Sequence, residues 1–299
     1  MLLLTVIGSC AWPLAVAAAP ISWNEVQALP LPVAGQRIAY GDDPEQFGEL
    51  RLPAKPAAGP SGVPVMVLLH GGCWLSEFDY RYMTRLAAAL SDQGYATWTP
   101  EFRRVGDAAG GWPNTLRDAA LATDYLAVLA QQHPLNLGLD LGRVVVIGHS
   151  AGGHLALWMA ARGKLPPDSP LYLPHPLRIH AVIGLDAVTD LTGFRIGPPN
   201  SCHSVVDQLM GGTPQTQPRR YAEASPPALL PLGVPQWLIQ GGQDPIVSTA
   251  SVLSYAATAK RAGDQVMVLE QPASGHFESV VPRGPAWQAL LFAVRQAAR

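Results

Sequence analysis

The segment Gly148-His-Ser150-Ala-Gly152 combines a nucleophilic side chain with small residues at a sharp turn. It follows an apolar run at residues 143–147 and precedes a helix-like stretch at residues 151–162, so a strand, a turn and a helix are expected in that order. Such a turn requires small flanking residues, and the N-terminus of the following helix favours developing negative charge. We therefore predict that Ser150 is a nucleophile presented at the end of a buried strand.

A serine hydroxyl attacks a carbonyl efficiently only when a neighbouring base takes its proton. Where a strand–turn–helix presents the serine, the chain order is serine, acid, histidine. His276 lies in the loop after the last expected strand, at residues 265–269, and is the predicted general base. Asp244 follows the expected strand at residues 235–240, and it would either orient the imidazole or cap the next helix. Weaker alternatives are His203 for the base and Asp186 and Asp190 for the acid.

The segment His70-Gly-Gly-Cys-Trp74 follows a continuous apolar run at residues 63–69, which reads as a buried strand. Stabilising an oxyanion requires preorganised backbone donors. Gly71 and Gly72 lack Cβ and can turn their N–H groups into the site, and Ala151, directly after the nucleophile, would supply a third donor. These three residues are the predicted oxyanion hole.

Several other residues near these segments have open roles. His149 and His154 flank the nucleophile and are expected to be packed or hydrogen-bonded rather than catalytic. Cys73 and Cys202 could form a disulfide, but the sequence does not give their separation. Four aromatic residues could line an apolar pocket, although packing in the core or rim explains them equally well: Trp74, Trp112, Phe194 and Phe277.

Strand-like and helix-like segments alternate along most of the chain. Expected strands cover residues 63–69, 95–99, 143–147, 180–185, 235–240 and 265–269, and expected helices cover residues 78–93, 113–132, 151–162, 247–262 and 285–298. This alternation predicts an α/β fold with a mostly parallel sheet and helices on both faces. Residues 36–52 would add one or two antiparallel edge strands. Residues 189–232 break the alternation and are expected to form a lid-like insertion above the site, within a single domain at residues 19–299.

The composition limits the kinds of partner. With 299 residues, 48% of them hydrophobic and 14% charged, the chain is globular and long enough for one well-buried core. The net charge of −2 and the lack of a basic run argue against nucleic acid as a partner. The expected partner is a small-molecule substrate, and the oligomeric state stays open.

The N-terminus has features of an export signal. Residues 1–18 carry no charged side chain, and they contain an apolar run at residues 2–7 and the small-residue sequence Ala15-Val-Ala17. We predict a signal peptide cut after Ala17 or Ala18, and hence a secreted or periplasmic protein. The alternatives are an uncleaved membrane anchor, the one case in which a membrane would be a partner, or a buried N-terminal segment in a cytoplasmic protein.

The motifs HGGCW and GHSAGGHLA together resemble the HGGxW branch of the α/β-hydrolases. That branch is close to the hormone-sensitive-lipase-like esterases, the bacterial feruloyl-esterase-like proteins and the kynurenine formamidases. The resemblance extends from about residue 40 to the C-terminus and includes Glu101-Phe-Arg-Arg, Trp112-Pro and Asp118. It implies the α/β-hydrolase fold and an esterase or arylformamidase that needs no cofactor and no metal.

The expected reaction is hydrolysis of a carboxylic ester through an acyl-enzyme on Ser150. Hydrolysis of an arylformamide is the alternative, on the strength of the resemblance. A more remote alternative is a non-catalytic ligand-binding protein on the same fold. Proteins of that kind usually lose the base, whereas His276 is present here.

Overall fold

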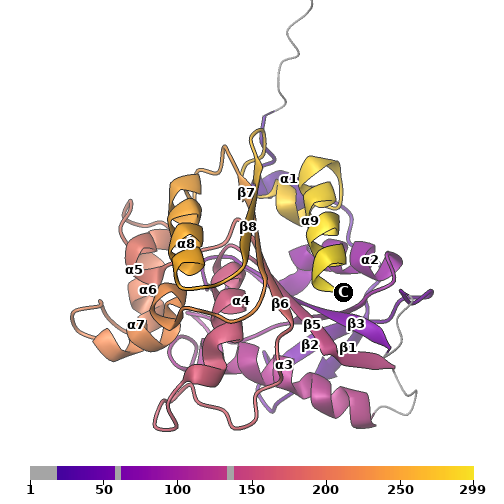
Figure 1. The fold of residues 1–299 in the computed structure, drawn as a ribbon, viewed down its shortest axis with the longest axis horizontal. Helices are drawn as coiled ribbons and strands as arrows, with labels where there is room; N and C mark the ends of the chain where they lie inside the picture. The colour runs from indigo at the N-terminus through magenta and orange to yellow at the C-terminus, as the bar shows by residue number, and fades with distance from the viewer. Residues whose placement is uncertain (1–18, 58–61, 133–137) are drawn as a thin grey trace, which may run out of the picture.

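The computed structural model describes residues 19–57, 62–132 and 138–299. The predicted signal peptide at residues 1–18 lies outside these ranges. The described chain forms an eight-stranded sheet in the order β1-β2-β4-β3-β5-β6-β7-β8 (Figure 1). Its strands are β1 (Gln36–Ala39), β2 (Phe47–Arg51), β3 (Val63–Leu69), β4 (Ala96–Pro100), β5 (Leu139–His149), β6 (Ala181–Leu185), β7 (Gln236–Gly241) and β8 (Val266–Gln271).

The sheet is parallel from β4 through β3, β5, β6 and β7 to β8. The two strands at its other edge, β1 and β2, pair antiparallel with each other, and β2 pairs antiparallel with β4. The prediction of a mostly parallel sheet with antiparallel edge strands is therefore confirmed. Every residue of β3 is buried, because a parallel strand in the middle of such a sheet is covered on both faces.

Helices cover the two faces of the sheet (Figure 1). One hydrophobic core lies beneath α1 (Trp23–Ala28), α2 (Thr84–Asp92) and α9 (Gly284–Ala297), where Met66 and Leu68 of β3 point. The other lies beneath α3 (Asn114–Gln132), α4 (Ala151–Ala161) and α8 (Thr249–Arg261), where Val65, Val67 and Leu69 point. The alternation of side chains along a strand thus supplies both cores. The short helix α1, which the sequence pattern did not indicate, begins with a capping box at Ser22.

Residues 189–232 form short helices on the α4 and α8 side of the sheet (Figure 1). They are α5 (Leu191–Phe194), α6 (Cys202–Met210), α7 (Pro218–Ala224) and the 3₁₀ turn η3 (Pro226–Leu229). Apolar side chains of this segment, including Leu191, Val206 and Tyr221, join the core formed with α4. The segment therefore packs into the same layer as the neighbouring helices.

Candidate active site

Ser150 lies where β5 ends and α4 begins. Its backbone angles, φ 54° and ψ −118°, lie outside the regions that residues with a Cβ ordinarily occupy. The turn brings backbones very close together. A Cβ at Gly148 would collide with the backbone of Gly152, and a Cβ at Gly152 would collide with the carbonyl oxygens of Leu69 and His70. These contacts explain why both flanking positions are glycine.

Asp244 and His276 meet at the same edge of the sheet. Asp244 follows β7 and His276 follows β8, and His276 Nδ1 lies 2.7 Å from Asp244 Oδ2. The other carboxylate oxygen of Asp244 accepts hydrogen bonds from the N–H groups of Ile246 and Val247. Burial raises the pKa of Asp244, but the hydrogen bond and charge of His276 and these two N–H groups outweigh it and hold the pKa below its usual value. An ionised Asp244 keeps the His276 proton on Nδ1, which leaves the Nε2 lone pair free to act as a base.

Ser150 and His276 are each only 4% exposed. The segments that carry Ser150 and His276 lie side by side: the ring of His149, the residue directly before Ser150, has its centre 4.7 Å from the ring centre of His276. Within the described ranges, no hydrogen bond joins Ser150 Oγ to His276 Nε2. In enzymes without bound substrate this bond is often long and tightens only when substrate binds.

The three predicted oxyanion donors differ in whether their N–H groups already have a hydrogen-bond partner. Gly71 N–H donates to the hydroxyl of Tyr82, so the expectation that it points into the site is wrong. The reason is that the 3₁₀ turn η1 (Tyr80–Met83) places this hydroxyl against the loop. The N–H groups of Gly72 and Ala151 have no protein acceptor among the described residues and are available. Gly72 has a φ of 92°, and a Cβ there would collide with Phe78, so only glycine fits.

A buried ion pair anchors the loop that carries Gly72. The ring of His70 stacks on Phe102, and its Nε2 lies 2.8 Å from Glu101 Oε1. Arg104 Nη1 lies 2.9 Å from the same oxygen. Burial raises the pKa of Glu101, but the neighbouring His70 and Arg104 outweigh it and keep the pKa below its usual value. Glu101, which directly follows β4, thus holds the first residue of the loop, a role that the sequence did not indicate although Glu101 lies in a segment that carries the family resemblance.

His149 and His154 are packed and hydrogen-bonded, as the sequence analysis predicted. His149 Nδ1 lies 2.9 Å from the Tyr82 hydroxyl, and its Nε2 lies 2.8 Å from the carbonyl oxygen of His276. His154 Nε2 lies 3.0 Å from the carbonyl oxygen of Ala224. Burial lowers the pKa of His149 to about 3 and that of His154 to about 4, so both rings are neutral at physiological pH.

The alternative acids and base have other partners. Asp186 accepts hydrogen bonds from Gly241 N–H and the Ser279 hydroxyl, and Asp190 caps the N-terminus of α5. His203 Nδ1 lies 2.5 Å from the carbonyl oxygen of Phe194. None of the three forms a hydrogen bond with Ser150 or His276 in the described part of the chain.

A disulfide joins Cys73 to Cys202, which settles the pairing that the sequence left open. Their Cα atoms are 5.0 Å apart, a usual separation for a disulfide. The bond ties the loop after β3 to α6 across 129 residues of chain. The Cys73 N–H, which immediately follows Gly72 N–H, also has no protein acceptor among the residues described.

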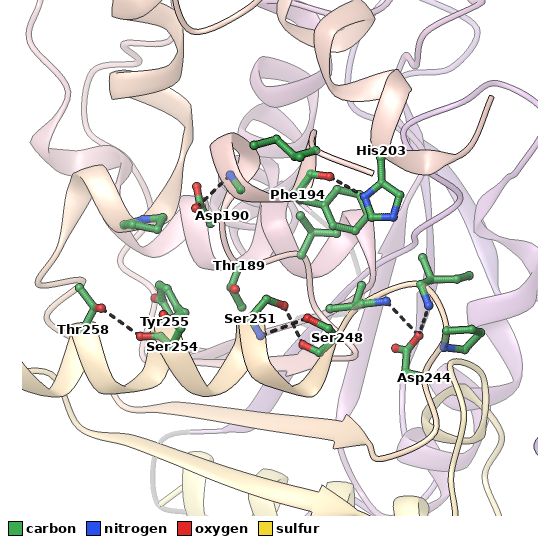
Figure 2. A pocket seen from close by; sticks show the side chains of 17 residues that line it. Thr189, Asp190, Phe194, His203, Asp244, Ser248, Ser251, Ser254, Tyr255 and Thr258 are labelled. Carbon is green, nitrogen blue, oxygen red and sulfur yellow. Dashed lines mark hydrogen bonds between the residues drawn. The ribbon is translucent and has the colours of Figure 1, made fainter. Parts of the chain in front are cut away.

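A cavity of about 490 Å³ lies between α5, α8 and the loop after β7, and Asp244 of that loop forms part of its wall (Figure 2). Its opposite walls carry the rings of Phe194 and His203 and the hydroxyls of Ser251 and Ser254. Phe194 lines this cavity, but neither Ser150 nor His276 is among its lining residues, so the interpretation that Phe194 lines a substrate pocket stays a prediction. Trp74 is buried in the core.

Neither a metal cluster nor a membrane-spanning helix occurs in the described ranges. There, His, Cys, Asp and Glu side chains do not gather in groups of three or more that could hold a metal ion. Nor does any helix described have the length and apolar character required to cross a bilayer.

The sheet order and the strained serine turn define an α/β-hydrolase. Residues 52–257 match the family model described as BD-FAE, and because this match covers more than half of the chain, the chain belongs to that family. The resemblance noted in the sequence is thereby confirmed at the level of fold and superfamily.

Curated and solved relatives agree with this assignment. The chain is 22% identical over 220 residues to a probable carboxylic ester hydrolase, LipM, from Mycobacterium tuberculosis; the match covers 71% of this chain and 49% of that protein. Overall, the chain spans about half the length, or less, of the curated relatives it matches. A truncated carbohydrate esterase from gut microbiota has a similar fold, with a TM-score of 0.72 at 17% identity over 90% of this chain and 97% of that one. The esterase Est2 of Thermogutta terrifontis also has a similar fold, with a TM-score of 0.67 at 22% identity over 91% of this chain and 95% of that one.

Proposed function

We propose that this protein hydrolyses carboxylic esters, with Ser150 as nucleophile, His276 as general base and Asp244 as the residue that orients the base. The observation that carries the proposal is the 2.7 Å bond between His276 Nδ1 and Asp244 Oδ2 beside a serine held in a strained turn. The names of LipM and of the esterase structures support the same reaction class.

In the proposed cycle, Ser150 Oγ attacks the ester carbonyl carbon while His276 Nε2 takes the hydroxyl proton. The negative charge moves to the carbonyl oxygen, where the N–H groups of Gly72 and Ala151, which have no acceptor in the described part of the chain, would donate to it. His276 then returns the proton to the departing alcohol, leaving an acyl group on Ser150. A water molecule, activated by the same imidazole, releases the acid and restores the serine.

The test is a substrate panel with matched variants. The wild-type protein and Ser150→Ala are assayed on p-nitrophenyl acetate and butyrate, a feruloyl ester and N-formylkynurenine. We expect turnover of esters that disappears in Ser150→Ala, and labelling of the wild type alone by a fluorophosphonate probe. Faster turnover of N-formylkynurenine than of every ester would replace ester hydrolysis by arylformamide hydrolysis. Unlabelled Ser150 with no turnover would instead support a binding protein.

We also propose that the protein is exported. The disulfide between Cys73 and Cys202 supports this proposal, because such bonds persist in oxidising compartments and are rare in the cytosol. The predicted signal peptide gives the same localisation independently. Mass spectrometry of the protein from its native host would test it, and an intact N-terminus at Met1 in a cytosolic fraction would contradict it.

A further inference from the structure

Four groups from distant parts of the chain form one buried line of hydrogen bonds beside the candidate active site. Gly71 N–H contacts the Tyr82 hydroxyl, that hydroxyl contacts His149 Nδ1, and His149 Nε2 contacts the backbone carbonyl of His276. The line begins in the loop that carries the oxyanion donors and ends in the loop that carries the base. It passes through the residue directly before Ser150.

While the ring of His149 is neutral, the donors and acceptors in this line can be arranged in only one way. A backbone N–H can only donate and a backbone carbonyl can only accept, so both ends are fixed. Gly71 therefore donates to the Tyr82 oxygen, the Tyr82 O–H donates to His149 Nδ1, and His149 Nε2–H donates to the His276 carbonyl. This order requires a protonated tyrosine and a neutral histidine carrying its proton on Nε2.

The surroundings keep both groups in that state. Tyr82 and His149 are buried, with 6% and 1% of their surfaces exposed. Burial lowers the pKa of His149 to about 3 and raises the pKa of Tyr82 above its usual value. Aromatic rings surround the line, since Trp23 packs edge-on to Tyr82 and also contacts Phe277. Water is therefore largely kept from competing for these bonds.

We propose that Tyr82 and His149 are positioning residues, which hold the oxyanion loop and the base loop at the separation that ester hydrolysis requires. This inference rests on the proposed function. Gly71 N–H fixes the loop, while the N–H groups of Gly72 and Cys73 find no acceptor among the described residues and can donate to the substrate. Because catalysis depends on placing the base and the donors to within a fraction of an ångström, a fixed link between their loops acts on the transition state more than on substrate binding.

The link can be cut at two points. Tyr82→Phe removes the hydroxyl that bonds Gly71 and His149, and His149→Phe removes the imidazole while keeping an aromatic ring. We expect each variant to lose about ten- to a hundredfold in kcat with KM changed less than threefold, because misplaced groups weaken transition-state contacts. The double variant should be no slower than the slower single variant, since one break already separates the loops. His149→Gln, whose amide can still donate to the His276 carbonyl, should recover part of the loss.

Matched controls separate positioning from stability. Thr123→Val removes a buried hydroxyl that bonds the Ala119 carbonyl within α3, and His154→Phe removes a buried neutral imidazole four residues after Ser150. Rates are taken per active site by fluorophosphonate titration, so that unfolded protein does not count. We expect both controls to lose stability and keep kcat.

The proposal fails if Tyr82→Phe and His149→Phe retain wild-type kcat per titrated site, or if their losses multiply in the double variant. It also fails if the controls lose as much kcat as the test variants. Failure of the proposed function is a distinct result, because either Ser150→Ala would then keep its turnover or the wild type would turn over no ester and take up no probe.

Discussion

Asp186 is a buried carboxyl group whose replacement should stabilise the protein in a pH-dependent way. It follows β6, is 1% exposed, and accepts hydrogen bonds from Gly241 N–H and the Ser279 hydroxyl. Burial raises its pKa from 3.8 to about 7, against the opposing effects of His276 and these two donors. Asn at this position keeps an acceptor for Gly241 and tolerates the backbone φ of 46°.

The sign of the effect follows from proton binding. Between about pH 4 and pH 7 the unfolded chain carries an ionised Asp186 while the folded state keeps the proton, so raising the pH favours unfolding. Each pH unit well inside this interval is worth about 1.4 kcal/mol, and the slope halves at the folded pKa, so from pH 5 to pH 7 the wild type should lose roughly 2 kcal/mol relative to Asp186→Asn. Above the folded pKa of about 7 both states are ionised, and the difference should level off.

The assay is urea unfolding of the wild type and Asp186→Asn between pH 5 and pH 8, with m-values compared to confirm that the same surface unfolds. Ser279→Ala serves as the control, because losing a donor to the carboxylate should extend the fall in wild-type stability to higher pH. In an Asp186→Asn background, Ser279→Ala should add no pH dependence to the unfolding free energy. A free-energy difference between Asp186→Asn and wild type that stays constant from pH 5 to pH 8 would refute the reasoning.

Three further changes test other contacts. Asp244→Asn should lower kcat by about 10³- to 10⁴-fold with His276 still in place, because the amide no longer favours the required tautomer; steady-state kinetics measure this, and a loss under tenfold would contradict it. Cys202→Ser should cost about 2–5 kcal/mol of unfolding free energy by removing the link to Cys73, visible as a lower Tm; an unchanged Tm would count against it. Gly152→Val should prevent folding, because its side chain meets backbone that cannot move; soluble, active protein would show that the turn can relax.

The sequence predicted the strands better than the contacts between loops. The run at residues 63–69 is β3 with the same bounds, because a strand buried on both faces is continuously apolar and ends where polar or turn residues begin. The helix expected at residues 78–93 instead divides into η1 and α2, and that division places Tyr82 against the loop after β3. A change from one helix type to another leaves little trace in hydrophobic spacing.

Chain order alone indicated which residues could meet at the sheet edge. Asp244 and His276 each follow a parallel strand, and the carboxyl ends of such strands lie together, so their bond follows from topology. The partner of Gly71 could not be found in this way, because no periodic signal relates position 71 to position 82. The disulfide between Cys73 and Cys202 likewise depends on how residues 189–232 pack, and that segment lacks a strong pattern.

The loop carrying His276 is held from two sides by groups whose charge states suit the proposed reaction. On one side, His149 Nδ1 accepts a hydrogen bond from the Tyr82 hydroxyl and its Nε2–H donates to the His276 carbonyl, which only a neutral ring can do. On the other, Asp186 binds Ser279, three residues after the base. When His276 takes a proton from the nucleophile, the new positive charge arises beside the ionised Asp244, while the adjacent imidazole, with its pKa near 3, stays uncharged. A second protonated histidine with its ring centre 4.7 Å away would oppose this step, so the burial that neutralises His149 keeps the base able to accept its proton.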